Sequence, residues 1–346
     1  MAFLSSIFKR LSLNMVNLLS AADSAQDQDQ DDIDRSVNPY QPTAMEVILV
    51  RAMLEKALRL PPEIINGILD HAEYWPHTST VIDYSNWPQG QRVVNAGDSN
   101  SENAFLLRTL PVGFLKPPSS FFENDSNREV PLEPIPREPK EFPVDTYQSR
   151  ISPTLSHPCR KIKFTIVSHD QGWGGEPRTR RTYNNSYTWF DIGLERCLQT
   201  SDDIDKPTFD PQTLSTILPK VREVDPNNVG NSHVQGTHTF DFPLCPQKDT
   251  MIQCNEVANG QYHQYEVEWK WTDNISSADL FDTGYGCEEG LIENPLPKVG
   301  RGQATGDGKF VRDLKLGDVI TVWAKARFAG WANYIKRIQV DVYWVV

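Results

Sequence analysis

The segment Tyr265–Thr272, YEVEWKWT, decides the fold class of this chain. Apolar side chains occupy every second position, and charged side chains stand between them: Tyr265, Val267, Trp269 and Trp271 against Glu266, Glu268 and Lys270. Because successive side chains of a strand point to opposite faces, this period of two predicts a β-strand with one buried and one solvent-facing side. Trp269 is therefore expected in a core, and Glu268 outside it.

Four more segments show the same alternation: residues 161–168 (KIKFTIVS), 237–244 (THTFDFPL), 318–328 (DVITVWAKARF) and 338–346 (IQVDVYWVV). Helical patterns are missing between them, and Asp307-Gly308 and Gly317-Asp318 indicate turns. Strands without crossover helices pair antiparallel, so residues 159–346 are predicted to form an antiparallel β-sandwich of jelly-roll or galactose-binding-like type. The predicted core comprises Phe164, Ile166, Phe240, Phe242, Val267, Trp269, Ile338, Val340 and Val342.

A small helical hairpin is predicted at residues 43–78, which makes the fold class α+β. Thr43 and Glu46 form the capping-box pattern that begins a helix. Pro61 and Pro62 end that helix and can begin the next. Apolar residues then recur at helical spacing on one stripe: Ile64, Ile65, Ile68, Leu69 and Ala72.

Two further segments flank the hairpin. Residues 1–42 are predicted to be a disordered acidic lead, because the aspartate-rich part after Asp23 has almost no apolar side chains to bury. Residues 79–158 are rich in proline and are predicted to be an arm or linker in which short apolar pieces pack. The lead leaves mitochondrial targeting and secretion open.

Composition excludes some functions. The 346 residues carry a net charge of −12, which phosphate backbones repel, so nucleic-acid binding is not expected. The chain has no apolar run of about 18 residues, so no membrane-spanning helix is expected. Five cysteines without a CxxC pair favour a reducing compartment, and we expect a cytoplasmic protein.

The segment Ser168–Gly175, SHDQGWGG, directly follows a predicted strand. Three glycines stand near charged side chains and one tryptophan, which is typical of a recognition loop at one end of a sandwich. Asp170, Trp173 and Arg178 are the predicted binding residues, with a protein or a carbohydrate as ligand. The alternative is a simple corner, in which Trp173 folds back to plug the end of the sandwich.

A second candidate loop lies between the last two predicted strands. Arg327, Trp331 and Asn333 are predicted to bind the same ligand if both loops share one end of the sandwich. Strand parity decides whether they do, and the sequence leaves this open. The alternative is an ordinary hairpin with Trp331 capping the core.

Catalytic signals are weak. His169 and Asp170 are adjacent, so on a strand they would point to opposite faces. His233, His238 and His263 are scattered through the β region without the close spacing of a metal site. We therefore expect no catalytic residue, metal or cofactor, and predict a non-catalytic binding protein. An enzyme of a biosynthetic pathway that uses the sandwich cavity stays open as an alternative.

Two resemblances rest on these motifs. SHDQGWGG and WAKARFAGW, behind LPPEIINGILDHAEYW, resemble a group of largely uncharacterised fungal proteins, which implies no specific activity. LPPEIINGILDHAEYW also resembles the opening of an F-box, in which Leu60, Pro61, Glu63, Ile68 and Leu69 fit the pattern, but the residues after Trp75 lack its later helices. That resemblance implies a ubiquitin-ligase substrate adaptor that docks on a scaffold. It requires the apolar stripe of residues 63–75 to be solvent-exposed.

Overall fold

The computed structural model describes residues 40–97, 102–113, 157–199, 209–217, 234–235, 238–239, 245–275 and 295–346. Residues 41–346 belong to one compact unit. Most of the acidic lead and the larger part of the proline-rich arm lie outside the described residues, as do Phe240, Phe242 and His233. The predictions made for those parts therefore stay predictions.

The predicted helical hairpin is present as α2 (Ala44–Leu58) and α3 (Pro62–His71). The capping box begins α2: the Glu46 N–H donates to Thr43 Oγ1 at 3.3 Å, and the Thr43 N–H donates to Glu46 Oε2 at 2.7 Å. Pro62 is the first residue of α3, where its missing N–H costs no helical hydrogen bond. Local sequence alone therefore specifies both helix starts.

Both helices pack one side against the core. The buried side chains are Ala44, Val47 and Leu54 of α2 and Ile65 and Leu69 of α3. The other side of α2 exposes Met45, Leu49 and Met53 at a spacing of four residues. Arg51 Nη1 donates to the backbone oxygen of Val346 at 2.8 Å, which ties the hairpin to the C-terminal strand.

Sheet A contains β1 (His77–Asp83), β2 (Arg92–Asn95), β4 (Cys159–His169), β10 (His263–Lys270) and β12 (Ala332–Trp344). Its order is β1-β12-β4-β10, and β2 also pairs with β12. Sheet B contains β3 (Asn103–Arg108), β5 (Thr188–Gln199), β6 (Phe209–Ile217), β9 (Met251–Cys254) and β11 (Val319–Ala326). Its order is β3-β11-β5-β6, and β9 also pairs with β5. Pairing in both sheets is antiparallel, as predicted.

The remaining elements are short. Strands β7 (Val234–Gln235) and β8 (His238–Thr239) pair with each other. A 3-10 turn, η4 (Pro297–Val299), and a helix, α4 (Lys309–Asp313), lie between β10 and β11, where we expected no helix. The predicted turn at Asp307-Gly308 continues into α4, because Gly308 adopts a positive φ of 70° and caps it.

Three strands of the two sheets precede the predicted sandwich segment in the sequence. β1, β2 and β3 lie between residues 77 and 108, in and next to the segment predicted as an arm with packed pieces. β1 and β2 pair with β12, and β3 pairs with β11. The packed pieces of the arm are therefore strands of the two sheets.

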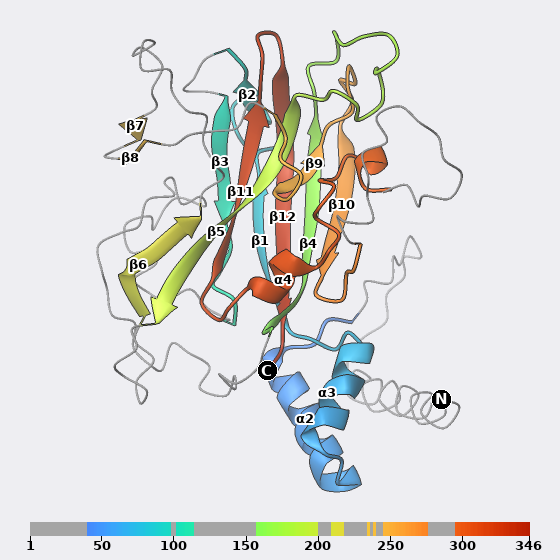
Figure 1. The fold of residues 1–346 in the computed structure, drawn as a ribbon, viewed down its shortest axis with the longest axis vertical. Coiled ribbons are helices and arrows are strands. Elements are labelled where there is room, and N and C mark those ends of the chain that lie inside the picture. The colour runs from blue at the N-terminus through green and yellow to red at the C-terminus, as the bar shows by residue number, and fades with distance from the viewer. Residues whose placement is uncertain are drawn as a thin grey trace, which may run out of the picture. The chain divides into compact units, whose positions relative to one another are not determined.

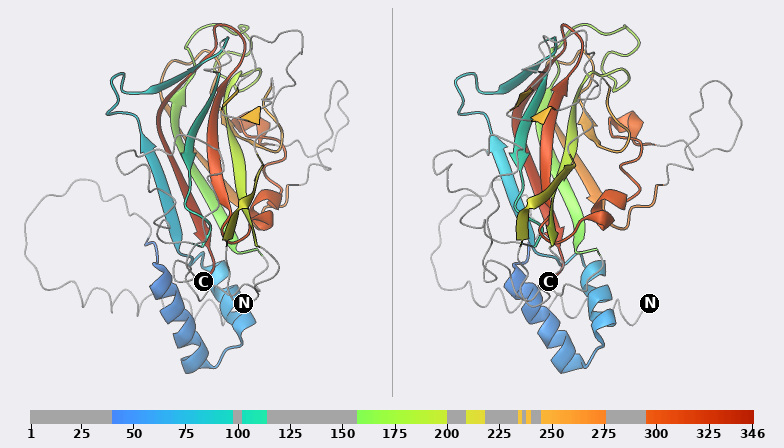
Figure 2. Two further views of the ribbon diagram at one scale, coloured as in Figure 1. Left: turned by 90° about the vertical axis from the view of Figure 1, so that its left-hand side faces the viewer. Right: turned by 60° about the vertical axis from the view of Figure 1, so that its left-hand side comes forward.

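The predicted alternation in YEVEWKWT is confirmed. Val267 pairs with Phe164 and Trp269 with Ile162, and all four side chains are buried. Glu266 is exposed on the opposite face. Ile166, Ile338, Val340 and Val342 are also buried, as predicted. The described chain thus mixes helices with two antiparallel sheets that contribute to one hydrophobic core (Figure 2).

Sheet B differs from sheet A because both faces of β11 are buried. Ile320, Val322 and Ala324 belong to the core. The side chains between them, Trp323 and Lys325, point the other way and are also buried. In each sheet, we call the side that carries the core residues the inner face and the opposite side the outer face.

Figure 1 shows the helical hairpin at one end of the two sheets and long loops at the other. We call these the helix end and the loop end. β12 begins at the loop end with Ala332 and ends at the helix end with Trp344. None of the described helices is long and apolar enough to cross a membrane.

Candidate functional site

The two loops singled out in the sequence meet at the loop end. The Ala332 N–H, at the start of β12, donates to Gln171 Oε1 at 3.2 Å. A Cβ atom added to Gly330 would lie 3.3 Å from Cη2 of Trp173. Trp173 therefore lies directly over the backbone of the loop between β11 and β12. Both candidate loops therefore lie at the same end of the sheets, a point that the sequence left open.

Asp170 is buried, and the expectation that it would be exposed is wrong. Its carboxylate accepts backbone hydrogen bonds from Gly172 at 2.7 Å, Ala258 at 2.5 Å and Asn259 at 2.9 Å. Burial raises the pKa of Asp170, while these three N–H groups act in the opposite direction. Asp170 thus joins loop 170–175 to loop 255–262, and it has no free oxygen to offer a ligand from outside.

Two glycines allow that junction. Gly172 has a φ of +82°, and a Cβ there would lie 3.0 Å from Cα of Gly260. Gly175 has a φ of +63°, and a Cβ there would lie 2.6 Å from a methyl carbon of Val257. The glycines of SHDQGWGG therefore serve the corner itself, through positive φ and close backbone approach.

Trp173 and Arg178 are exposed, as predicted. The Trp173 side chain keeps 64% of its surface accessible, so it does not plug the end of the sheets. Arg180 and Arg181 are exposed nearby, and Arg180 Nε donates to the backbone oxygen of Gly174 at 3.1 Å. A single loop thus presents one indole and three guanidinium groups on a corner that its backbone holds in place.

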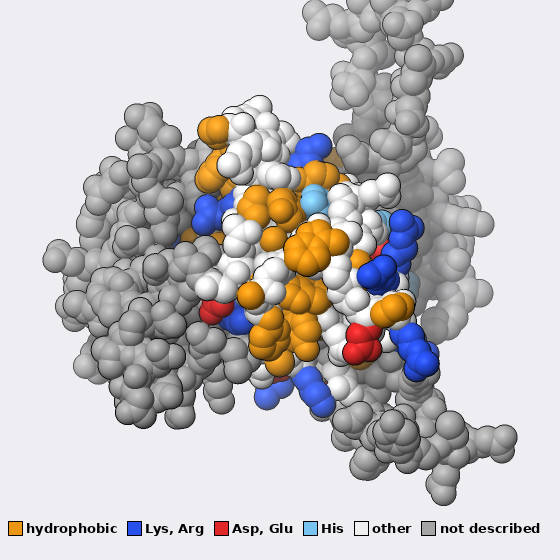
Figure 3. Space-filling view, turned by 90° about the horizontal axis from the view of Figure 1, so that it is seen from above, with side chains coloured by type: hydrophobic (Ala, Val, Ile, Leu, Met, Phe, Trp, Pro, Cys, Tyr) orange, Lys and Arg blue, Asp and Glu red, His pale blue; other side chains and the backbone are white. Residues whose placement is uncertain are grey.

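Other aromatic side chains extend this surface. Phe328 is 48% exposed, and Tyr187 contacts it edge to face with ring centroids 4.7 Å apart. Tyr187 also contacts Trp331 at 5.3 Å, and Trp331 is partly exposed. We call Trp173, Tyr187, Phe328 and Trp331 the aromatic patch. Figure 3 looks onto this end and shows hydrophobic side chains gathered there, with Lys and Arg side chains around them.

Arg327 is buried, which contradicts its prediction as a ligand-contacting residue. Its guanidinium donates to the backbone oxygens of Glu102 and Ala326 and, at 2.5 Å, to Asn103 Oδ1. It also lies over the Trp189 ring, 5.3 Å from the centroid. Arg327 therefore joins the starts of β3 and β5 to the end of β11.

Asn333 is also buried, and it bridges the two sheets from inside. Its Oδ1 accepts from Asn255 Nδ2 at 3.0 Å, and its Nδ2 donates to the Trp189 backbone oxygen at 3.3 Å. Asn255 in turn bonds Thr188 at 3.1 Å and Ser168 at 2.7 Å. Asp170, Arg327 and Asn333 thus support the loop end, and Trp173, Arg178 and Trp331 reach its surface.

Phe328 and Tyr187 were missed in the sequence. Phe328 ends the predicted strand at residues 318–328, but it has a φ of +65° and its side chain is exposed. Arg181, Asn185 and Ala258 also have positive φ in the loops of this end. Such non-glycine conformations cost free energy and tend to gather where a loop must hold a functional shape.

The histidines of the described residues take part in contacts within the protein. No three His, Cys, Asp or Glu side chains of the described ranges gather closely enough to hold a metal ion. His263 instead contacts Asn259 Nδ2 through Nε2 at 2.7 Å. His169 stacks on Tyr334 at 4.7 Å, and burial lowers its pKa.

The scaffold-docking surface implied by the F-box resemblance is mostly covered. Ile65 and Leu69 of the stripe are buried in the core, and Trp75 is 4% exposed. Ile64 alone of the large apolar side chains between 63 and 75 is strongly exposed. The requirement that this stripe be open to solvent is therefore not met.

Comparison with known proteins adds no relative. Neither a protein-family model, nor a curated protein, nor a solved structure matches this chain.

Proposed function

We propose that this chain is a non-catalytic binding protein whose loop end recognises a partner protein. In this proposal the two sheets form a β-sandwich of the jelly-roll or galactose-binding-like type, and the sandwich holds the loops rigidly. The observation that supports it most is Trp173, which stays 64% exposed on a corner fixed by Asp170. Large exposed aromatic side chains on ordered loops are typical of interaction surfaces.

The chemistry of the patch favours a protein as the ligand. Tryptophan, tyrosine and arginine are the residues that most often dominate the binding energy of protein interfaces. Here Trp173 and Phe328 protrude, and Arg178, Arg180 and Arg181 flank them. We expect the partner to present an apolar pocket for the protruding aromatic side chains. Acidic side chains should lie beside that pocket, because guanidinium groups bind carboxylates well.

An enzyme using the space between the sheets has less support. That interior is filled by core side chains from both sheets, including Phe164, Phe190 and Trp269. The polar groups that enter it at the loop end, Ser168, Asn255 and Asn333, bond one another. A reacting substrate would have to displace these contacts. A cytoplasmic location stays a proposal that rests on the five cysteines without a CxxC pair.

The test compares partner capture by the unmodified full chain and three variants of it. Partners captured by the unmodified protein are identified and purified, and their affinities are then measured by titration. Trp173→Ala should weaken binding by about 30-fold or more, which corresponds to the roughly 2 kcal/mol of an interface hot spot. Trp87→Ala is the matched control, because Trp87 is also exposed, at 42%, but belongs to the segment between β1 and β2.

Arg178→Ala should weaken the same complex, and Trp173→Ala should change the free energy of unfolding by less than about 1 kcal/mol. Equal affinity for the unmodified protein and Trp173→Ala would refute the proposal. Loss of binding after enzymatic removal of the partner's glycans would show a carbohydrate ligand instead.

A further inference from the structure

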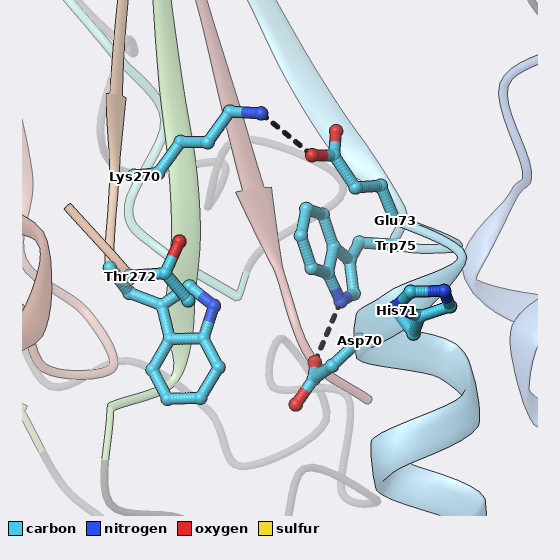
Figure 4. Close-up of a pocket in the computed structure, with 7 residues that line it drawn as sticks. Asp70, His71, Glu73, Trp75, Lys270 and Thr272 are labelled. Carbon is cyan, nitrogen blue, oxygen red and sulfur yellow. Dashed lines mark hydrogen bonds and ion pairs between the residues drawn. The ribbon is translucent and has the colours of Figure 1, made fainter. Parts of the chain in front are cut away.

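A cavity of about 390 Å³ lies at the helix end, far along the sheets from the aromatic patch. The last turn of α3 and the residues after it form one side, and the end of β10 forms the other: Asp70, Glu73 and Trp75 face Lys270, Trp271 and Thr272. Figure 4 shows Lys270 and Glu73 reaching each other across it, with Trp75 between them and Asp70. Its volume falls within the usual range of small-molecule sites.

Two indole rings give this cavity apolar walls of fixed orientation. Trp75 Nε1 donates to Asp70 Oδ1 at 2.9 Å, which sets the angle of the buried Trp75 ring. The Arg160 guanidinium lies 4.1 Å from the centroid of the Trp271 ring and supports it. Neither indole therefore has to be ordered by an incoming ligand, which lowers the entropic cost of binding.

The charged groups of the cavity are already paired with one another. Arg160 binds Asp70 through two nitrogens, at 2.9 and 3.2 Å. Glu73 accepts from Lys161 at 2.8 Å and from Lys270 at 2.7 Å. Burial acts to raise the pKa of Glu73, but the two lysines outweigh it and hold that pKa below its ordinary value, so the carboxylate stays ionised.

These pairs determine which ligand fits. A charged ligand would have to compete with an existing partner for each ion. A neutral ligand can use the lone pairs and N–H groups that remain on carboxylates and ammonium groups already paired. The backbone of Glu73 has a φ of +48°, so the chain holds this carboxylate over the cavity in a conformation that non-glycine residues rarely adopt.

We propose that the cavity binds one neutral pyranose unit of a carbohydrate. The C–H face of the sugar ring packs on the indole of Trp271, and its hydroxyl groups exchange hydrogen bonds with Asp70, Glu73 and Lys270. Such binding requires an apolar wall and a rim whose groups both donate and accept hydrogen bonds, and the cavity has both. The site is separate from the aromatic patch and does not depend on the protein partner proposed above.

The test uses the full chain with a panel of neutral hexoses, N-acetylhexosamines and their short oligomers, observed by saturation-transfer NMR. Glucuronate and glucosamine are the charged counterparts. At least one neutral sugar should bind, more tightly than its charged counterpart. Trp271→Ala should weaken binding about ten-fold or more. Thr272→Trp, at an exposed position on the rim, should block the cavity without removing a buried side chain.

Trp87→Ala is the control for an exposed tryptophan elsewhere, and Trp173→Ala separates this site from the loop end. Both should bind the sugar as the unmodified chain does. The proposal is overturned if no neutral sugar binds at millimolar concentration, or if the charged sugars bind better. It is also overturned if Thr272→Trp, with an unchanged melting temperature, keeps full affinity.

Discussion

The outer face of sheet A and the outer face of sheet B have opposite surroundings. On sheet A, Lys163 pairs with Glu266 at 2.9 Å, and the two side chains are 28% and 52% exposed. On sheet B, Lys325 lies 2.8 Å from Asp191, and neither side chain has any exposed surface. The two ion pairs have similar lengths, yet one is solvated and the other is in the protein interior.

This difference shows what a period of two can and cannot establish. Alternation identifies the inner face of a strand, which carries Trp269 in β10 and Val322 in β11. It does not show whether the outer face is covered. Where it is covered, polar side chains bond within the protein: the Trp323 indole donates to Thr321 Oγ1 at 3.2 Å, and burial lowers the pKa of Lys325 against the opposing effect of Asp191.

The largest expected effect comes from breaking the buried pair. Lys325→Met should reduce the free energy of unfolding by about 3–5 kcal/mol, because the Asp191 carboxylate stays buried without its cation. Lys163→Met, the matched change on sheet A, should cost less than about 1 kcal/mol, because water replaces the lost partner. Urea unfolding of the two variants measures both. Equal costs would show that the two outer faces are alike.

Adding Asp191→Leu to Lys325→Met sharpens this test. The double variant should recover most of the lost stability, since replacing both buried ions by apolar groups removes the unpaired charge. If the double variant is as unstable as Lys325→Met alone, the loss comes from disturbed packing.

Tryptophan truncation on the two faces should give nearly equal effects. Trp323→Ala on the outer face of sheet B should cost about 3–5 kcal/mol, as should Trp269→Ala on the inner face of sheet A. Both side chains are almost fully buried. Val81→Ala, on the outer face of β1 and 41% exposed, should cost less than about 1 kcal/mol. Thermal unfolding of the three variants measures these costs, and a Trp323→Ala cost as small as that of Val81→Ala would contradict the prediction.

A smaller effect is expected in the loop that leaves sheet A. Asp170→Ala should cost roughly 2 kcal/mol or more, because it leaves the N–H groups of Gly172, Ala258 and Asn259 without their acceptor. Arg178→Ala, in the same loop but exposed, should change stability by about 0.5 kcal/mol or less. Hydrogen exchange at these three amides provides a direct readout. Unchanged protection in Asp170→Ala would contradict this role.

The smallest effect concerns two histidines on the outer face of sheet A. Burial lowers the pKa of His77 and of His169 below the ordinary value of 6.5. The folded state thus binds these protons less readily than the unfolded state, so stability is full above pH 6.5 and declines as the pH falls below it. His77→Gln with His169→Gln should flatten this decline in urea unfolding at a series of pH values. An identical slope in the double variant would assign the decline to other groups.

Much of the fold could be predicted because its signals are local. The capping box at Thr43 and the alternation around Trp269 specify a helix start and a strand face within a few residues. β1 and β3 were harder to predict, because they pair with β12 and β11, which lie more than 200 residues later in the chain.

The site could be predicted only in part. Trp173 and Arg178 are exposed, as expected of binding residues, whereas Asp170, Arg327 and Asn333, which were also predicted to bind the ligand, are buried. A polar side chain is buried when the fold brings it enough hydrogen-bond partners, and those partners come from distant segments. The cavity at the helix end was not predicted for the same reason, since Glu73 and Lys270 meet only after folding.

The position of β12 has a consequence for how the protein is made. β12 lies between β1 and β4, so the middle of sheet A is supplied by residues 332–344. Until the ribosome has released these residues, β1 lacks the strand it pairs with among the described residues, and the edge of β4 that pairs with β12 stays open. Contacts this distant along the chain slow folding, and unpaired strand edges favour aggregation. The unfinished chain is therefore expected to be more prone to aggregation than the complete one.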